Sequence, residues 1–235
     1  MSLQTPVCVV VGVGAGNGAA LARRFTTAGY RVALLARSVQ VTQKLATELE
    51  GARAYVCDVT DAASVERAFG AIRTELGEVD VLIHNPGSGV WGNVEDITPE
   101  DFEASWRTNA LGGLLVAQQV IPAMKKHRRG GIVFIGATAS RRGGAKMAAF
   151  APAKAAQKSL AESMARHLWP AGVHVALVLV DGVVNSPASR KRMPDKPDSF
   201  FAEPDAIADQ VFQLTQQKSS AWTFELEVRP YAEVW

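Results

Sequence analysis

Val7-Cys-Val-Val-Val-Gly-Val-Gly-Ala-Gly-Asn-Gly18 is the stretch that decides the fold of this 235-residue chain. Its first five residues are apolar and mostly β-branched, which is typical of a strand buried on both faces of a parallel sheet. Glycines follow, and an alanine-rich segment then continues as a predicted helix through Phe25. Strand, glycine turn and helix N-terminus together predict an anion site, because unpaired N–H groups and the helix dipole point at the turn.

The pyrophosphate of a dinucleotide is the usual ligand of such a turn. We therefore predict cofactor contacts from the turn itself, through Gly12, Gly14, Gly16, Asn17 and Gly18. A tight turn without a ligand is the alternative, since a glycine cluster alone is a weak signal. The strand before the turn and the helix after it favour ligand binding.

Composition and charge exclude several classes of protein. The formal net charge of +2 is too small to argue for a nucleic-acid partner, and no apolar run approaches the ~20 residues of a membrane span. No secretory signal precedes the first strand. Cys8 and Cys57 are predicted to be small core residues, without a disulfide framework or a metal site. We expect one domain over residues 1–235, in a reducing, cytoplasmic setting.

Strands and helices alternate along the rest of the chain. The pattern predicts an α/β fold with a Rossmann-type, doubly wound parallel sheet of about seven strands and helices on both faces. A long helix is expected from its N-cap at Thr98 to about Met124, and Thr60 or Asp61 is expected to cap an earlier helix. Residues 186–202, a polar loop with three prolines, are predicted to form a mobile lid over a site. The other expected strands are 31–36, 52–57, 79–83, 131–136, 173–180 and 222–228.

Arg37 follows the second predicted strand, at the position that distinguishes the two nicotinamide nucleotides in doubly wound folds. An acidic residue there binds the ribose hydroxyls of NAD, whereas an arginine suits the additional phosphate of NADP. The neutral Ala36 and the cationic Arg37 therefore favour NADP(H) over NAD(H), although a solvated surface arginine is the alternative. Asp58, after the third strand, is placed to meet an adenine amino group.

Four further sets of polar residues stand at predicted strand ends or inside helices. His84-Asn85-Pro86-Gly87 is a second glycine turn at the carboxyl end of a strand, where ligands bind in open α/β sheets. Asn109 lies in an apolar helix, either as a buried structural amide or as a residue that lines a site. Lys154 stands early in an alanine-rich helix, and Asp181-Gly182 ends the sixth strand.

The order and spacing of these residues resemble the short-chain dehydrogenase/reductase family along essentially the full chain. Gly12-x3-Gly16-x-Gly18 resembles the family's glycine motif, with Val11 in place of the usual threonine. Asp58, Asn109 and Lys154 resemble its adenine-contacting aspartate and its catalytic asparagine and lysine. The resemblance implies cofactor contacts from Asn85, Gly87, Lys154 and Gly182, and a homodimer or homotetramer built on the helices of Asn109 and Lys154.

Two departures from the family pattern bear on the chemistry. Ala137 stands where the family has its catalytic serine, and Phe150 where it has the tyrosine that exchanges a proton with the substrate oxygen. No tyrosine lies between Tyr55 and Tyr231, so no small shift of the alignment restores one. A positioned general acid typically contributes ~10²–10⁴-fold in rate, so the family's usual mechanism would be badly impaired. A shift could offer Thr138 or Ser140 as the serine.

Three functions remain open from the sequence. The first is an NADP(H)-dependent oxidoreductase for a small carbonyl or alcohol substrate. It would retain Asn109 and Lys154, with the proton supplied by Lys154, water, Thr138 or Ser140; His84 and Asp181 are further candidates. The second is a catalytically silent NADP(H)-binding protein that acts as a cofactor sensor or a supporting subunit. The third is a scaffold without a ligand, which the glycine motif, Asp58 and Lys154 argue against.

Overall fold

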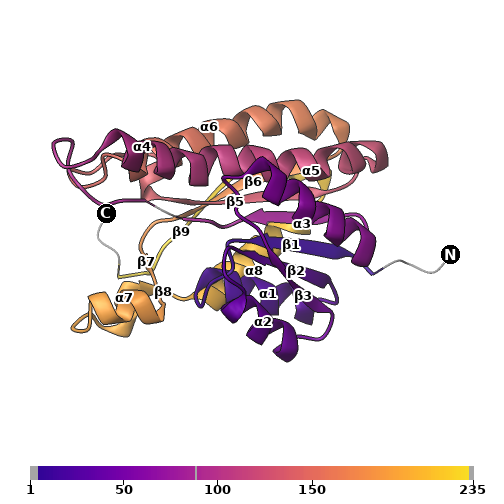
Figure 1. The fold of residues 1–235 in the computed structure, drawn as a ribbon, viewed down its shortest axis with the longest axis horizontal. Helices are drawn as coiled ribbons and strands as arrows, with labels where there is room; N and C mark the ends of the chain where they lie inside the picture. The colour runs from indigo at the N-terminus through magenta and orange to yellow at the C-terminus, as the bar shows by residue number, and fades with distance from the viewer. Residues whose placement is uncertain (1–4, 88, 233–235) are drawn as a thin grey trace.

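A seven-stranded parallel sheet forms the centre of the protein (Figure 1). The computed structural model describes residues 5–87 and 89–232. The strand order β3-β2-β1-β4-β5-β6-β9 reverses direction between β1 and β4, which makes the fold doubly wound and Rossmann-type, as expected. The strands are β1 (Val7–Val11), β2 (Arg31–Ala36), β3 (Ala52–Val56), β4 (Val81–His84), β5 (Gly131–Ala137), β6 (His174–Val180) and β9 (Glu225–Val228).

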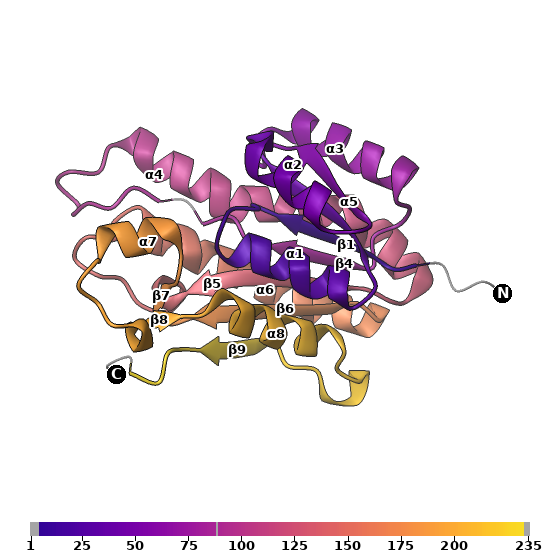
Figure 2. The same cartoon turned by 90° about the horizontal axis from the view of Figure 1, so that it is seen from below.

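Helices cover both faces of this sheet and bury two apolar clusters against it (Figures 1 and 2). Phe69 and Phe134 lie in the cluster under α3, α5 and α6, and Phe25 in the cluster under α1 and α8; all three are fully buried. One face carries α3 (Ala62–Glu75), α4 (Pro99–Trp106), α5 (Gly112–His127) and α6 (Phe150–Leu168). The other carries α1 (Asn17–Thr27), α2 (Val39–Glu48) and α8 (Pro204–Thr215).

Two helices begin where side-chain caps were expected. The Thr98 hydroxyl accepts from the backbone N–H of Asp101 at 3.2 Å, and Pro99 occupies the first position of α4. Of the two candidate caps for α3, Asp61 is the one that caps it, by accepting from the N–H of Ala63 at 2.9 Å.

The expected single helix from Thr98 is interrupted. A π-helical segment, Arg107–Leu111, separates α4 from α5 and carries Asn109. Two glycines directly after it let α5 approach its neighbours closely. A Cβ on Gly112 would lie 2.8 Å from Cγ2 of Val59, and one on Gly113 would lie 2.8 Å from Cε1 of Phe134. A π-turn changes the register of the backbone ladder, a local feature that hydrophobic periodicity does not reveal.

Residues 186–202 are more regular than the expected polar loop. Ser186 caps α7 (Pro187–Arg192), which begins with a proline at its first position, a favourable arrangement for a short helix. The segment closes with β8 (Phe201–Ala202), which pairs in parallel with β7 (Val183–Val184). Arg190 links the parts: its Nε donates to Asn185 at 2.7 Å and its guanidinium pairs with Asp198 at 2.7 Å.

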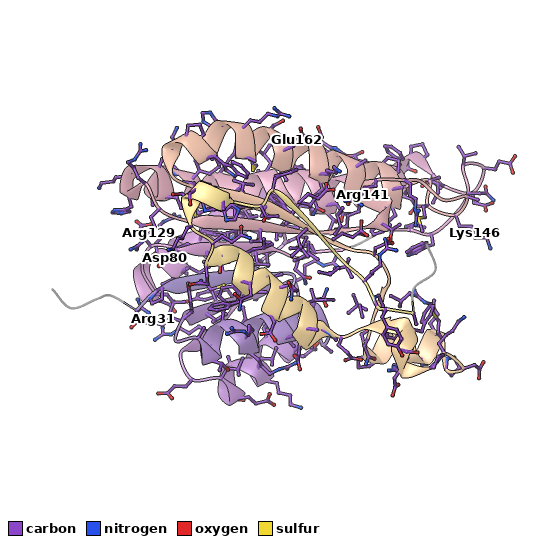
Figure 3. The ribbon with its side chains drawn as sticks, turned by 180° about the vertical axis from the view of Figure 1, so that it is seen from behind. Arg31, Asp80, Arg129, Arg141, Lys146 and Glu162 are labelled. Carbon is purple, nitrogen blue, oxygen red and sulfur yellow. The ribbon has the colours of Figure 1, made fainter. Side chains whose placement is uncertain are left out.

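The amino ends of the strands lie opposite the glycine turn. There Arg129 and Asp80 form an ion pair at 2.7 Å, and both are labelled in Figure 3. Cys8 and Cys57 are buried and unpaired, each within one of the two apolar clusters. Within the described ranges, no helix has the length and apolar character needed to cross a membrane.

Gly18 and Gly14 provide a matched test of the packing between β1 and α1. A Cβ on Gly18 would lie 2.7 Å from Cα of Val13, whereas a Cβ on Gly14 would meet no atom within 4 Å. We expect Gly18→Ala to lower the free energy of unfolding by about 1–3 kcal/mol through overpacking. Gly14→Ala should change it by less than about 0.5 kcal/mol. Urea denaturation of both variants measures this, and equal losses would contradict the packing described.

Candidate functional site

Gly12 joins three strands at the carboxyl edge of the sheet. Its N–H donates to the carbonyl of Leu35 at the end of β2 at 2.9 Å, and its carbonyl accepts from Nδ2 of Asn85, after β4, at 2.8 Å. Gly12 has a φ of +77°, and a Cβ there would lie 2.8 Å from the backbone nitrogen of Pro86. Only glycine fits such a position, and hydrogen bonds of its own backbone fix the conformation of the turn.

The N-terminus of α1 meets the requirements of an anion site. Its N-cap, Gly16, offers no side-chain acceptor, and no acidic residue stands in the first turn. The first N–H groups of the helix are thus left to a ligand. Asn17 has a buried Oδ1 without a hydrogen-bond partner among the described residues, which also leaves an acceptor for a ligand. A Cβ on Gly16 would lie 3.5 Å from Cβ of Ser186, so the lid segment borders this turn.

A cavity of about 330 Å³ extends from the glycine turn to the ends of β2 and β3. It brings together five of the predicted cofactor residues: Gly12, Gly14, Arg37, Asp58 and Gly87. The other six predicted cofactor residues are not among its lining residues: Gly16, Asn17, Gly18, Asn85, Lys154 and Gly182. The glycine turn, the uncapped N-terminus of α1 beside it and the cationic Arg37 suit the adenosine and phosphates of a nicotinamide nucleotide. The remaining lining residues are Val13, Ala36, Ser38, Cys57, Val59, Thr60, Pro86 and Thr108.

Asp58 is held as a carboxylate at the far end of this cavity. Its Oδ1 accepts from the N–H of Thr60 at 2.9 Å and from the Thr60 hydroxyl at 2.8 Å. The backbone hydrogen bond is the main cause that lowers the pKa of Asp58, and the charges of Arg37 and Arg107 act in the same direction. The carboxylate is therefore fixed and charged, with cations on either side.

Lys154 is buried in the first turns of α6, with a side chain aimed at the sheet. Its Nζ donates to the carbonyl of Ile135 in β5 at 2.9 Å, to Oε1 of Gln157 at 3.2 Å and to the carbonyl of Pro86 at 3.4 Å. Pro86 lines the cavity, so Lys154 lies directly behind its wall. Burial lowers the pKa of Lys154 to about 7. Lys154 therefore titrates near neutral pH.

Asn109 connects to Lys154 through Gln157. Both Asn109 and Gln157 are fully buried. Nε2 of Gln157 donates to the carbonyl of Asn109 at 3.3 Å, while Nδ2 of Asn109 donates to the carbonyl of Ser105 at 2.8 Å. The two residues predicted to be catalytic are thus brought together, with a third side chain between them.

His84 is fully buried at the end of β4, against Phe134 and the π-helical segment. Burial lowers the pKa of His84 to about 3, and the charge of Lys154 adds to the shift, whereas backbone groups of Asn109 and Thr108 oppose it. The imidazole is consequently neutral at physiological pH. A neutral ring inside the core favours the structural interpretation of His84 over a role as general acid.

Phe150 is held in place by its neighbours. Its ring centroid lies 5.4 Å from that of Trp91, and Nζ of Lys154 lies 6.0 Å from it. A Cβ on Gly89 would lie only 2.5 Å from Cδ2 of Phe150. The position therefore contains a packed aromatic ring and no hydroxyl, and Ala137 at the end of β5 likewise offers none.

The other hydroxyl candidates have partners of their own. Ser140 is buried and accepts from the N–H of Ala137 at 3.2 Å. Thr138 donates to Oδ1 of Asp181, whose Oδ2 pairs with Arg229. These contacts tie the ends of β5, β6 and β9 together. Among the tyrosines, all of which lie in the described residues, Tyr231 is almost fully exposed and Tyr55 donates to Glu75.

Sequence reasoning did not identify Gln157 or Trp91 as parts of this region, and it placed Ser186 only within the predicted lid. Gln157 carried a usable signal, since it is a polar residue one helical turn after Lys154 on an alanine-rich helix. Ser186 and Trp91 approach from distant loops, and nothing in their local sequence predicts the contact.

Comparisons with known proteins agree with the fold. Residues 6–197 match the family model of the short chain dehydrogenases. The chain is 32% identical over 182 residues to the 3-oxoacyl-[acyl-carrier-protein] reductase MabA of Mycobacterium bovis, covering 77% of this chain and 70% of the reductase.

Two solved structures extend the similarity to nearly the whole chain. A short-chain dehydrogenase from Rhodopseudomonas palustris is 32% identical with a TM-score of 0.82, covering 96% of this chain and 99% of the other. An alcohol dehydrogenase from Thermococcus sibiricus, complexed with 5-hydroxy-NADP, is 27% identical with a TM-score of 0.88, covering 97% and 98%. On the family match and these similarities, the chain belongs to the short-chain dehydrogenase/reductase family.

Proposed function

We propose that this protein is an NADP(H)-dependent oxidoreductase that acts on a small carbonyl or alcohol substrate with a non-standard active site. The observation that carries the proposal is one cavity that joins Gly12 and Gly14 of the glycine turn to Arg37 and Asp58. The uncapped N-terminus of α1 follows this turn, and Lys154 lies behind the cavity wall. Anion binding at the helix and a cation at the ribose end both favour a phosphorylated dinucleotide. The bound 5-hydroxy-NADP of the Thermococcus enzyme supports the same preference.

In the proposed site we assign each predicted cofactor residue a role in nucleotide binding that is consistent with its position in the structure. The glycine turn and α1 hold the pyrophosphate, Arg37 meets the ribose phosphate, and Asp58 faces the adenine. Asn85 and Gly87 support the turn, and Lys154 lies nearest the reacting end, with Gly182 between β6 and β7. Hydride transfer is the chemistry that the cofactor supplies when bound. We further propose that residues 1–235 act as one nucleotide-binding domain and that residues 186–202 cover the substrate.

The alternative is that the protein binds the nucleotide without catalysing a reaction. Ala137 and Phe150 favour this alternative. Neither residue offers a proton or an oxyanion donor. The similar proteins named above are a reductase and dehydrogenases, which favours turnover over silence. As the source of the proton we propose Lys154, with its pKa of about 7, or water. The Thr138 hydroxyl already donates to Asp181, whereas the Ser140 hydroxyl accepts from the N–H of Ala137 and keeps its own proton.

Assembly into a homodimer or homotetramer is also proposed. Phe102 and Trp106, one turn apart on α4, are 46% and 42% exposed, which is high for two large apolar side chains on one face. A second copy of the chain that covers this face beside α5 and α6 would bury them.

Nucleotide preference tests the role of Arg37. We expect the unaltered protein to bind NADPH more tightly than NADH in a fluorescence titration. Arg37→Ala should weaken NADPH binding by about 10–100-fold, the value of a charge-assisted hydrogen bond. It should leave NADH binding nearly unchanged. Arg166→Ala, which removes an exposed arginine from α6, is the matched control. Equal losses for the two nucleotides would contradict the proposed role, and no binding of either would remove the proposed function.

Restoring the family's residues tests the two departures. We expect Ala137→Ser with Phe150→Tyr to raise NADPH-dependent reduction of small ketones and aldehydes by at least ~10²-fold, since a positioned acid is added beside Lys154. The same pair with Lys154→Met should show much less gain. A double variant that folds and binds NADPH but gains nothing would show that these two positions are not catalytic. Activity found only in the double variant would favour the silent alternative for the natural chain.

A further inference from the structure

Lys154 has an unusual environment for a buried ammonium. Each of its three N–H bonds has an acceptor, two of them backbone carbonyls from β5 and from the turn after β4, and the third the side chain of Gln157. Burying an ammonium is costly unless its donors are satisfied. Among described residues, the groups within hydrogen-bond distance of Nζ carry no formal charge. The orientation of the ammonium therefore depends on neutral acceptors alone.

Gln157 is the one acceptor of the three that belongs to a side chain, and this side chain is itself held in place. It is fully buried, and its Nε2 donates to the carbonyl of Asn109 at 3.3 Å. Asn109 lies in the π-helical segment, where the altered ladder frees backbone carbonyls for other donors. The amide is thus held at both ends, and its oxygen is directed at Lys154 by the backbone of another helix.

No other charged group lies against Lys154 and Gln157 among the described residues. The amide of Gln157 is therefore the main side-chain control on the orientation of the Lys154 ammonium. From β4, His84 faces the cluster with a pKa of about 3 and is neutral. From α6, Phe150 contributes a ring, and from α5 and the π-helical segment come Asn109 and backbone. Lys158, one residue beyond Gln157, pairs with Glu225 on β9 at 2.5 Å.

We propose that Gln157 is a positioning residue: it fixes the Lys154 ammonium at the wall of the nucleotide cavity in a chain where Phe150 offers no hydroxyl to do so. An amide side chain accepts from Lys154 and donates to Asn109, so it holds the lysine without taking its proton. The consequence for nucleotide binding rests on the proposed function. The consequence for Lys154 itself does not.

Titration of Lys154 by NMR, with isotope-labelled lysine and a Lys154→Arg variant for assignment, tests the proposal directly. The unaltered protein is expected to show a midpoint near 7. Gln157→Glu places a carboxylate against the ammonium and should raise the midpoint by at least ~1 pH unit, as an adjacent opposite charge does. Gln157→Met, similar in size but without an acceptor, should not raise it. Identical midpoints in folded protein for both variants would overturn the proposal.

NADPH titration gives the second readout. Gln157→Met should weaken NADPH binding by about tenfold, the loss expected for one hydrogen bond to a charged group. Gln157→Glu should retain more of the affinity, since its carboxylate still accepts from Lys154. A purely structural Gln157 would lower the melting temperature in both variants without separating their affinities. Gln118→Met, which makes the same change at an exposed site on α5, is the control.

A measurement on the unaltered protein keeps the proposal testable if the variants fail to fold. The ammonium protons of Lys154 should exchange with water far more slowly than those of the exposed Lys125, because each has an acceptor. Exchange as fast as at Lys125 would overturn the fixed geometry. Failure of the unaltered protein to bind any nucleotide, with the NMR results as expected, would remove the proposed function and leave the role of Gln157 standing.

Discussion

The close approach of three strand ends at Gly12 is the constraint on which the rest of the structure depends. One backbone residue donates to the end of β2, accepts from Asn85 after β4 and touches Pro86, all within hydrogen-bond or van der Waals distance. Any side chain at Gly12 would push these ends apart. Because α1 starts from the same turn, the direction of the helix, the mouth of the cavity and the spacing of the central strands are set together.

The fold, and the meeting of Gly12, Gly14, Arg37, Asp58 and Gly87 at one cavity, were predictable because short, contiguous stretches of sequence encode them. Val7 to Gly18 specifies a buried strand, a turn and a helix start in register, and Arg37 and Asp58 each follow directly from a strand end. In a parallel sheet, those ends must meet at one edge. What could not be predicted depends on contacts between distant elements. The π-helical segment lies directly before Gly112 and Gly113, which pack closely against Val59 and Phe134 from other elements. The acceptors of Lys154 include two backbone carbonyls that no pattern of side chains predicts.

The departures at Ala137 and Phe150 change the reacting end of the site more than its architecture. Phe150 fills its position with a ring packed on Trp91, and Gly89 leaves room for that ring. Lys154 keeps a fixed place because backbone carbonyls and Gln157 hold it, independent of any hydroxyl. In the proposed function, nucleotide binding and acid catalysis are therefore separable. The proposed nucleotide contacts are all present in the chain, while acid catalysis would need a proton source other than the two altered positions.

The parallel pairing of β7 with β8 bears on how strongly the site can bind. Val183 pairs with Phe201 and Val184 with Ala202, so the two ends of the loop formed by residues 185–200 are already together before any ligand arrives. The conformational entropy of closing that loop is lost during folding and not on association. A ligand that makes contact with α7 meets a pre-organised surface, and more of its contact energy is then expressed as affinity.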